Sequence, residues 1–280
     1  MKITLGFSTC PNDTYIFDAL VNGKIDAQGL KFIPVLADVE ELNSRALEGD
    51  LDVTKLSYHA YGHVSDNYKV LDAGSALGWG NGPLVVSKRK IYTDEVQHTR
   101  IAVPGKLTTA NFLTGIAFPD AKNKQYYLFS DIEEVVLSDA ADVGVLIHEN
   151  RFTYAERGLQ LIMDLGKFWE KTTQLPIPLG GIMVNRRIPD DVQVIIQRLI
   201  RESLTFAYEN PGSAMAYMKK YAQEMREDIL LKHVDTFVND FSLSLGEEGR
   251  AAINKLLEKG SSLGLFTMPG KDVFIPSDGL

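Results

Sequence analysis

Near its N-terminus the chain reads KITLGF at residues 2–7 and STCPNDT at residues 8–14. The first segment alternates in the manner of a β-strand and runs directly into a turn at Pro11. Residues 12–21 then fit a helix, and Gly23 follows as a typical C-terminal glycine. A strand that passes through a short turn into a helix is typical of an α/β fold, so this stretch favours that class.

The same order of elements continues along the chain. Apolar patterns predict further helices and strands in alternation. The predicted helices cover residues 39–47, 58–63 and 109–117, and the predicted strands cover residues 30–36, 51–55, 84–87, 100–103, 142–147 and 181–184. Strands that alternate with helices favour mostly parallel sheets.

Two pairs of segments in the two halves of the chain are weakly similar. Residues 52–56 and 142–146 both carry Asp-Val with a leucine four residues after the aspartate. Residues 82–89 and 180–187 both begin with glycine, continue with an apolar run and end on arginine. Chance similarity is one explanation. The other is that the chain forms two related α/β lobes, since the separation is too large for a solenoid.

From Pro189 onward the apolar spacing is helical, and proline suits the first turn of a helix. Helices that follow two sheet-forming halves are consistent with a block that wraps back onto the first lobe. We therefore expect a first α/β lobe from residues 1–90 and 181–280 and a second α/β lobe from residues 91–180. A lobe boundary that is crossed twice forms a hinged cleft, and such a cleft is the usual place for a small ligand.

The composition excludes several classes of protein. The 280 residues are 45% hydrophobic and 24% charged, which is an ordinary globular balance. The formal net charge of −8 repels phosphate backbones, so we do not expect a nucleic-acid partner. No apolar run approaches the roughly 20 residues of a membrane helix, and the only cysteine, Cys10, excludes an intrachain disulfide. The first residues do not form a secretory signal, so we expect a cytoplasmic protein.

Three turns that follow predicted strands hold the candidate binding residues. The first contains Asn12, the second is Lys55-Leu56-Ser57, and the third leads into a helix at Thr109-Ala110-Asn111. A turn into a helix exposes free backbone N–H groups at the positive end of the helix dipole, which suits a carboxylate. Helix capping is the plainer explanation for each turn, and capping and ligand binding are compatible.

None of these turns indicates a nucleotide or a metal. No GxGxxG motif follows the first strand, and the third turn lacks the P-loop spacing. His59 and His63 have the spacing of helical zinc pairs, but no third ligand is close in sequence, so we predict no metal site and no nucleotide cofactor. Cys10 is expected to be a buried or wall-lining thiol rather than a nucleophile. His233 lies in polar surroundings and indicates nothing specific.

His148 is the candidate catalytic residue. An apolar strand predicted at residues 143–147 runs directly into the polar run His-Glu-Asn-Arg at residues 148–151. We expect the imidazole to face the cleft with a pKa near the operating pH, as a general base requires. A single histidine is more often structural, but its place at the end of the strand favours function. Glu149 or Arg151 would orient the ring, bind substrate or form a surface ion pair.

Two strings carry a resemblance to a known family. STCPNDTYIF at residues 8–17 and GVLIHENRFTY at residues 144–154 resemble the 1,4-dihydroxy-6-naphthoate synthases of the futalosine route to menaquinone. The resemblance covers essentially the whole chain and departs at Thr9, where proline is expected; this loosens the turn and leaves the chemistry intact. It implies a two-lobed α/β, type II periplasmic-binding-protein-like fold with a ligand cleft between the lobes, used as a cytoplasmic lyase without a cofactor.

The resemblance also implies a reaction. The substrate would be cyclic dehypoxanthine futalosine, cleaved to 1,4-dihydroxy-6-naphthoate and a small sugar-derived fragment. His148 would be the proton acceptor, and its removal of a proton would start the fragmentation. Lys55, Leu56 and Ser57, together with Thr109 and Ala110, would contact the substrate.

Two other classes of function remain open. A solute-binding protein for a small carboxylate would share the fold, but it is expected to carry a signal peptide or a lipid-anchor cysteine. Cys10 does not fit the second role, because it follows a predicted strand and not a leader. A chorismate dehydratase of the same pathway is the nearest enzyme, and it is expected to lack the CPNDT string at residues 10–14 and His148. The expected partner is a small-molecule carboxylate, with neither nucleic acid nor membrane. The oligomeric state is open, a homodimer included.

Overall fold

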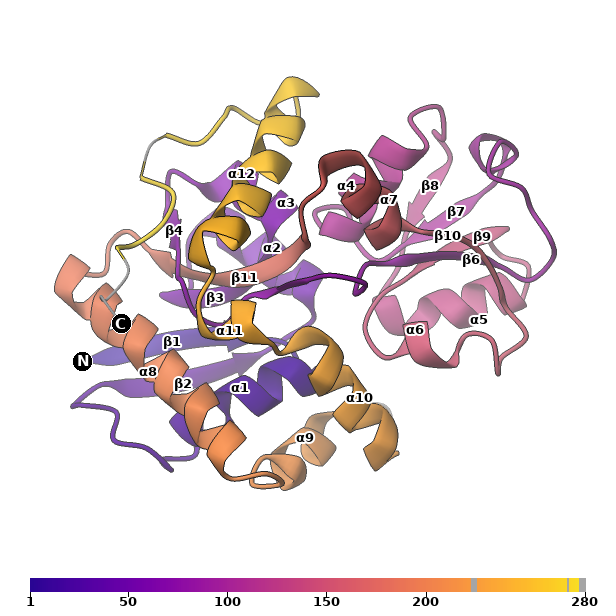
Figure 1. Ribbon diagram of the computed structural model, residues 1–280. Helices are drawn as coiled ribbons and strands as arrows, with labels where there is room; N and C mark the ends of the chain where they lie inside the picture. The colour runs from indigo at the N-terminus through magenta and orange to yellow at the C-terminus, as the bar shows by residue number, and fades with distance from the viewer. Residues whose placement is uncertain (223–225, 271, 277–280) are drawn as a thin grey trace.

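The computed structural model describes residues 1–222, 226–270 and 272–276, and these form two lobes, each built around one β-sheet (Figure 1). The first lobe contains β1 (Lys2–Phe7), α1 (Pro11–Val21), β2 (Lys31–Leu36), α2 (Val39–Glu48), β3 (Val53–Ser57), α3 (Tyr58–Val64), β4 (Tyr68–Val70), β5 (Ala76–Gly78), β11 (Ile177–Asn185), α8 (Asp190–Glu209), α9 (Met215–Tyr221), α10 (Glu227–Phe237), α11 (Asp240–Leu243) and α12 (Gly246–Ser262). The second lobe contains β6 (Leu84–Ser87), β7 (Ile101–Val103), α4 (Thr109–Ala117), β8 (Lys124–Tyr126), α5 (Ile132–Leu137), β9 (Val143–Leu146), α6 (Asn150–Thr153), β10 (Gln160–Asp164) and α7 (Leu165–Thr173), with short 3-10 turns at Val96–His98 and Phe129–Asp131. The expected two-lobed α/β architecture is confirmed.

Each sheet combines parallel and antiparallel strands. The first has the order β2-β1-β3-β11-β4, with β5 also paired to β11, and the second has the order β10-β6-β9-β7-β8. β1 is parallel to β2 and β3, and β7 is parallel to β8 and β9, whereas β11 and β6 are antiparallel to all their partners. The expectation of mostly parallel sheets is wrong for β6 and β11, because these strands enter from the opposite lobe and not through a helical crossover.

The weakly similar segments occupy equivalent positions in the two sheets. Asp52 precedes β3, and its carboxylate accepts a hydrogen bond from the Thr4 N–H of β1 at 2.9 Å. Asp142 precedes β9, and its carboxylate accepts one from the N–H of Arg100, the residue before β7, also at 2.9 Å. In the same way, β11 pairs with β3 as β6 pairs with β9. The similarity in sequence therefore coincides with a repeated structural unit.

The chain crosses between the lobes at residues 79–83 and at residues 174–176. The predicted division into 1–90 and 181–280 against 91–180 therefore differs from the observed one. Residues 84–87 form β6 in the second sheet, and β11 in the first sheet already begins at Ile177. A short apolar strand fits the interior of either sheet, so its pattern does not identify the lobe that it joins.

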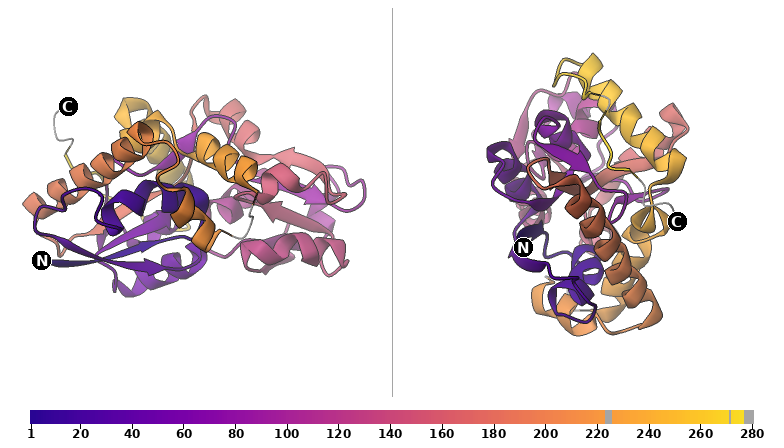
Figure 2. Two further views of the ribbon diagram at one scale, coloured as in Figure 1. Left: turned by 90° about the horizontal axis from the view of Figure 1, so that it is seen from below. Right: turned by 90° about the vertical axis from the view of Figure 1, so that its left-hand side faces the viewer.

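The C-terminal helices cover the first lobe (Figure 2). α8, α9 and α10 pack against α1, while α12 lies against α3 and β11. This arrangement agrees with a helical block that returns to the first lobe. Within the described ranges, none of the helices combines the length and the apolar character needed to cross a membrane.

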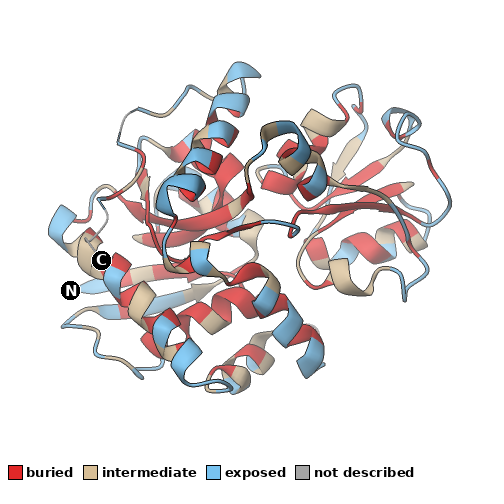
Figure 3. Ribbon diagram, in the orientation of Figure 1, coloured by how far each residue is buried: buried red, intermediate tan, exposed pale blue. Residues whose placement is uncertain are grey.

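One apolar core continues from the first lobe into the second. It joins Leu56 and Met183 of the first sheet to Val103, Leu113 and Trp169 of the second lobe, all of them buried. Buried residues concentrate on the central strands of both sheets and on parts of the helices that surround them (Figure 3). Burial of this apolar surface stabilises the contact between the two lobes. The shared core therefore keeps the helix starts of the two lobes close to each other.

The close approach of Gly82 and Gly166 yields a stability prediction. A Cβ atom on Gly82 would lie 2.3 Å from the backbone N and Cα of Gly166, at the start of α7. We expect Gly82→Ala to lower the free energy of unfolding by about 1–3 kcal/mol, since backbone must shift to admit the methyl group. Urea denaturation measures the change.

Gly115→Ala is the matched control. It lies inside α4, where an added Cβ meets only the Lys124 Nζ at 3.3 Å, the tip of a flexible side chain. Because alanine favours helix, we expect stability to stay equal or to rise by up to about 1 kcal/mol. If the two substitutions changed the free energy of unfolding equally, the close approach of Gly82 to Gly166 would not contribute to stability.

Candidate functional site

A cavity lies between the lobes, where strand ends and helix starts meet. It encloses about 680 Å³, part of it open to solvent. Seven of the eight predicted site residues line it, and only Asn111 does not. The lining residues are Ser8, Asn12, Asp13, Val39, Lys55, Leu56, Ser57, Ala76, Asn81, Gly82, Pro83, Thr108, Thr109, Ala110, Ile147, His148, Arg151, Leu179, Gly180 and Phe237.

A buried ion pair forms one wall of the cavity. The Nζ of Lys55 lies 2.9 Å from Oδ1 of Asp13, and the two side chains are 7% and 1% exposed. Asp13 Oδ2 also accepts hydrogen bonds from the N–H and hydroxyl of Ser8 at 3.1 and 2.7 Å, and Oδ1 accepts one from the Asn12 amide at 2.9 Å. These bonds fasten the turn after β1 to β3. The N-cap residue of α1 is Cys10, which makes no side-chain cap. Asn12 and Asp13 therefore do not cap the helix, and their side chains bind each other, Ser8 and Lys55.

Ser57 is held at the edge of the cavity by a residue that the sequence did not single out. Its N–H donates to Oδ1 of Asn43 at 3.0 Å, and its hydroxyl accepts from the Asn43 amide at 3.2 Å. Ser57 occupies the N-cap position of α3 but makes no side-chain cap there. Asn43, on α2, therefore forms hydrogen bonds with both the backbone N–H and the hydroxyl of Ser57. The explanation that Ser57 caps α3 with its side chain is wrong.

The start of α4 forms the opposite wall. Thr108 caps the helix by accepting a hydrogen bond from the Asn111 N–H at 3.2 Å, so Thr109 and Ala110 form the first turn. The N–H groups of a first helical turn have no partner within the helix, and both residues line the cavity. The Thr109 hydroxyl donates to the Leu179 carbonyl of β11 at 2.6 Å. This bond joins the second lobe to the first sheet.

The structure corrects the expected place of Asn111. Its side-chain amide donates to the Lys106 carbonyl at 2.8 Å, and its Oδ1 accepts from the Lys124 Nζ at 3.2 Å. Both partners lie in the second lobe outside the cavity lining. Asn111 lies one residue further into the helix than Ala110, and the turn of the helix directs its side chain away from the cavity.

His148 lines the cavity beyond the end of β9, where it was expected. Its φ of +56° places a non-glycine residue in the left-handed region, an uncommon conformation that often occurs at functional sites. The ring packs edge-on against Phe129, with centroids 4.6 Å apart. Its Nε2 is buried and has no hydrogen-bond partner in the described part of the chain.

The environment keeps His148 neutral. Burial, opposed by Asp13 and reinforced by Lys55, lowers the pKa of His148 to about 4. The expectation of a pKa near the operating pH is therefore wrong, because the cavity removes water that would solvate the imidazolium. At neutral pH the ring is unprotonated and able to accept a proton.

His233 of α10 lies beside His148 and was missed by the sequence reasoning. It is fully buried, and the two rings are nearly parallel with centroids 6.0 Å apart. His233 Nε2 lies 3.0 Å from Oδ1 of Asn12, and Nδ1 lies 3.6 Å from a carboxylate oxygen of Glu149. Burial, together with the nearby His148, lowers its pKa well below the usual range. His233 thus connects α10 to the turn after β1 through Asn12 and to the segment after β9 through Glu149.

Glu40 of α2 fastens the lobes together beside the cavity. Its carboxylate accepts hydrogen bonds from the N–H groups of Lys106 and Leu107 at 2.6 and 2.9 Å. A Cβ atom on the preceding Gly105 would come within 2.6 Å of this carboxylate. Burial raises the pKa of Glu40. The lobes are therefore closed over the cavity, with a carboxylate of one bound to the backbone of the other.

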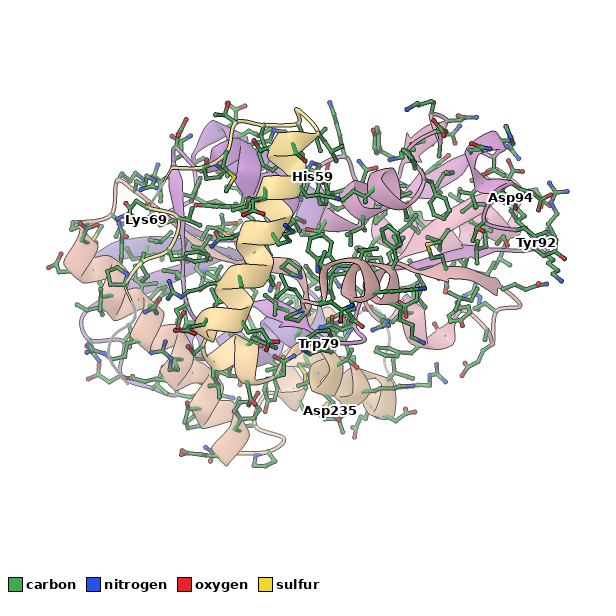
Figure 4. All side chains as sticks on the ribbon, turned by 45° about the horizontal axis from the view of Figure 1, so that its top comes forward. His59, Lys69, Trp79, Tyr92, Asp94 and Asp235 are labelled. Carbon is green, nitrogen blue, oxygen red and sulfur yellow. The ribbon has the colours of Figure 1, made fainter. Side chains whose placement is uncertain are left out.

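The remaining candidates have structural surroundings. His59, labelled in Figure 4, is buried on α3, with ring centroids 5.2 Å from Phe112 and 5.3 Å from His63. Burial lowers its pKa to about 4. Burial likewise raises the pKa of the Cys10 thiol, as is typical of an unreactive cysteine. Over the ranges that the structure describes, no three His, Cys, Asp or Glu side chains gather as a metal site would require.

Solved structures identify the class of fold. A crystal structure of a protein from Archaeoglobus fulgidus is 37% identical and superposes with a TM-score of 0.90, covering 95% of this chain and 98% of that one. A Candida albicans protein with the generic periplasmic-binding-protein fold is 14% identical with a TM-score of 0.70, covering 100% and 99%, a likeness that concerns the fold alone. The two sheets, the two crossings and the cavity between them define a two-lobed periplasmic-binding-protein-like protein.

Sequence comparison narrows this class. A family described as menaquinone biosynthesis matches residues 3–262. A Thermus thermophilus relative named 1,4-dihydroxy-6-naphtoate synthase is 41% identical over 98% of this chain and 99% of its own length. A Streptomyces coelicolor relative of the same name is 35% identical over 96% of each chain. The chain belongs to the menaquinone biosynthesis family.

The buried ion pair yields a prediction for stability. Asp13→Asn leaves the Lys55 ammonium buried without its counter-charge, so we expect a loss of about 3–5 kcal/mol in the free energy of unfolding. Adding Lys55→Met should restore part of this loss, because the unpaired charge is then removed. Urea unfolding of the two single variants and the double variant measures the coupling.

The exposed pair of Lys88 and Asp139 supplies the control. Its atoms lie 2.7 Å apart, but the side chains are 45% and 73% exposed. We expect Lys88→Met to cost less than about 1 kcal/mol, as is usual for surface pairs. A similarly small cost for Asp13→Asn would show that the pair in the cavity wall does not hold the site together.

Proposed function

We propose that this protein is a lyase that converts cyclic dehypoxanthine futalosine to 1,4-dihydroxy-6-naphthoate, with His148 as the general base. The observation that carries the proposal is the buried imidazole of His148, which is neutral at neutral pH and lines the same cavity as Thr109 and Ala110 in the first turn of α4. The names of the two relatives, which match this chain over nearly its whole length, support the choice of product.

The proposed mechanism uses groups that the cavity provides. His148 removes the proton whose loss begins the fragmentation, and a neutral imidazole is the form that can do so. The backbone N–H groups of Thr109 and Ala110 are placed to bind oxygen atoms on which negative charge develops. Closure of the lobes through Glu40 and Thr109 excludes water from the reacting atoms. Carbon–carbon cleavage driven by formation of an aromatic product needs no cofactor in this scheme.

The proposal extends to the setting of the reaction. The ligand is a small carboxylate, and the reaction takes place in the cytoplasm. Neither nucleic acid nor a membrane takes part, and the net charge of −8 supports the exclusion of nucleic acid. Within the cavity, Lys55, Leu56 and Ser57 contact the substrate from the first lobe.

The test is to incubate the purified protein separately with cyclic dehypoxanthine futalosine and with chorismate, and to measure consumption of each compound. Cyclic dehypoxanthine futalosine should be consumed with the appearance of naphthoate absorbance, and chorismate should not be consumed. Turnover of chorismate alone would replace the proposal with a chorismate dehydratase. If neither compound reacts but one raises the melting temperature, the protein is a solute-binding protein.

His148→Asn tests the assignment of the base. We expect turnover to fall by at least about 100-fold, the range typical of a lost general base, while product binding is largely kept. His98→Asn, an exposed histidine on the second lobe, is the control and should retain full turnover. A rate for His148→Asn within about tenfold of the parent would exclude His148 as the base.

A further inference from the structure

Arg151 places a second cationic group in the cavity. It lies on α6, three residues after His148, and its side chain is only 9% exposed. Its guanidinium faces residues 79–83, the first crossing between the lobes, where Nη2 donates to the Gly80 carbonyl at 3.0 Å. It also lies near the rings of Phe152 and Phe237, 5.7 and 6.0 Å from their centroids. The residue therefore occupies a polar corner with aromatic walls.

The charge of Arg151 is incompletely compensated by the protein. A guanidinium has five N–H donors, and the bond to Gly80 is the one hydrogen bond that it makes within the described residues. The nearest carboxylate, Asp164, lies 4.0 Å away, which is beyond hydrogen-bond distance. Glu170 also faces it, but a carboxylate oxygen of Glu170 accepts the Gly80 N–H at 2.6 Å. A buried guanidinium with free donors favours an anion.

The other cation of the cavity is already neutralised. Lys55 contacts Asp13 at 2.9 Å, and both side chains are buried. A carboxylate ligand placed at Lys55 would therefore meet the like charge of Asp13. A carboxylate placed at Arg151 would also lie near the like charges of Asp164 and Glu170, but neither of these accepts a hydrogen bond from the guanidinium in the described part of the chain, so the ligand would fill donors that remain open. Of the two cationic residues that line the cavity, Arg151 is the one available to an anion.

We propose that Arg151 binds the carboxylate of an aromatic ligand through its guanidinium, with the ligand ring against Phe237. This inference rests on the proposed function and adds the orientation of its substrate. The carboxylate lies at the crossing segment and α10, so the oxygen atoms at the reacting end lie toward the first turn of α4. A planar guanidinium suits this role because it can form two parallel hydrogen bonds to one carboxylate.

The test compares 2-naphthoate with the neutral 2-naphthamide by calorimetry. The parent protein should bind the carboxylate more tightly, and Arg151→Met should reduce that affinity by about 10- to 100-fold while leaving binding of the amide unchanged. Arg151→Lys should fall between them, since it keeps the charge but loses the two-bond geometry. Arg157→Met, an exposed arginine on the same lobe, is the control and should bind like the parent.

The outcomes separate this inference from the proposed function. If Arg151→Met or Arg151→Lys weakens both ligands equally, or neither, Arg151 does not bind the carboxylate. The same conclusion follows if the parent shows no preference for 2-naphthoate. If the parent turns over no futalosine compound yet its preference for the carboxylate depends on Arg151, the proposed function fails and the anion site stands. If the parent turns over its substrate and Arg151→Met leaves the KM unchanged, the proposed function stands and the anion site fails.

Discussion

Asp13 and Lys55 carry opposite charges in a buried wall of the cavity, and the arrangement of the site follows from keeping them paired. Removing two charges from water is costly unless further hydrogen bonds satisfy them, and Ser8 and Asn12 supply these bonds from the turn after β1. Asn12 in turn meets His233 of α10. Through these contacts the ion pair connects β3, the turn after β1 and α10. The side chains on this side of the cavity are therefore held in one conformation.

The same burial links the closed lobes to the chemistry of His148. The pKa of His148 is low because little water reaches the imidazole, and water is excluded because the lobes meet along a continuous apolar core. Glu40 adds a polar fastening between α2 and the loop before α4. Opening of the lobes would hydrate the ring and return its pKa toward the ordinary value of about 6.5. Closure of the lobes and the protonation state of His148 are therefore coupled.

Features set by neighbouring residues could be predicted from the sequence, and those set by distant contacts could not. The strand at residues 2–7, the start of α4 at Thr109 and the position of His148 all follow from local patterns. The antiparallel direction of β6 and β11 depends on the partner lobe, which short apolar strands do not specify. His233 lies far along the chain from Asn12, so no motif could join them, and the low pKa of His148 required the closed cavity itself.

Burial between the closed lobes holds the His148 imidazole in its neutral form. Titration of the histidine ring nitrogens by ¹⁵N NMR, with the His148 signals assigned from the His148→Asn spectrum, measures this state directly. His148 should stay unprotonated as the pH falls from about 8 to about 5, since its pKa lies near 4. Protonation of His148 with a midpoint at or above the ordinary value of about 6.5 would show that the lobes do not keep the imidazole neutral.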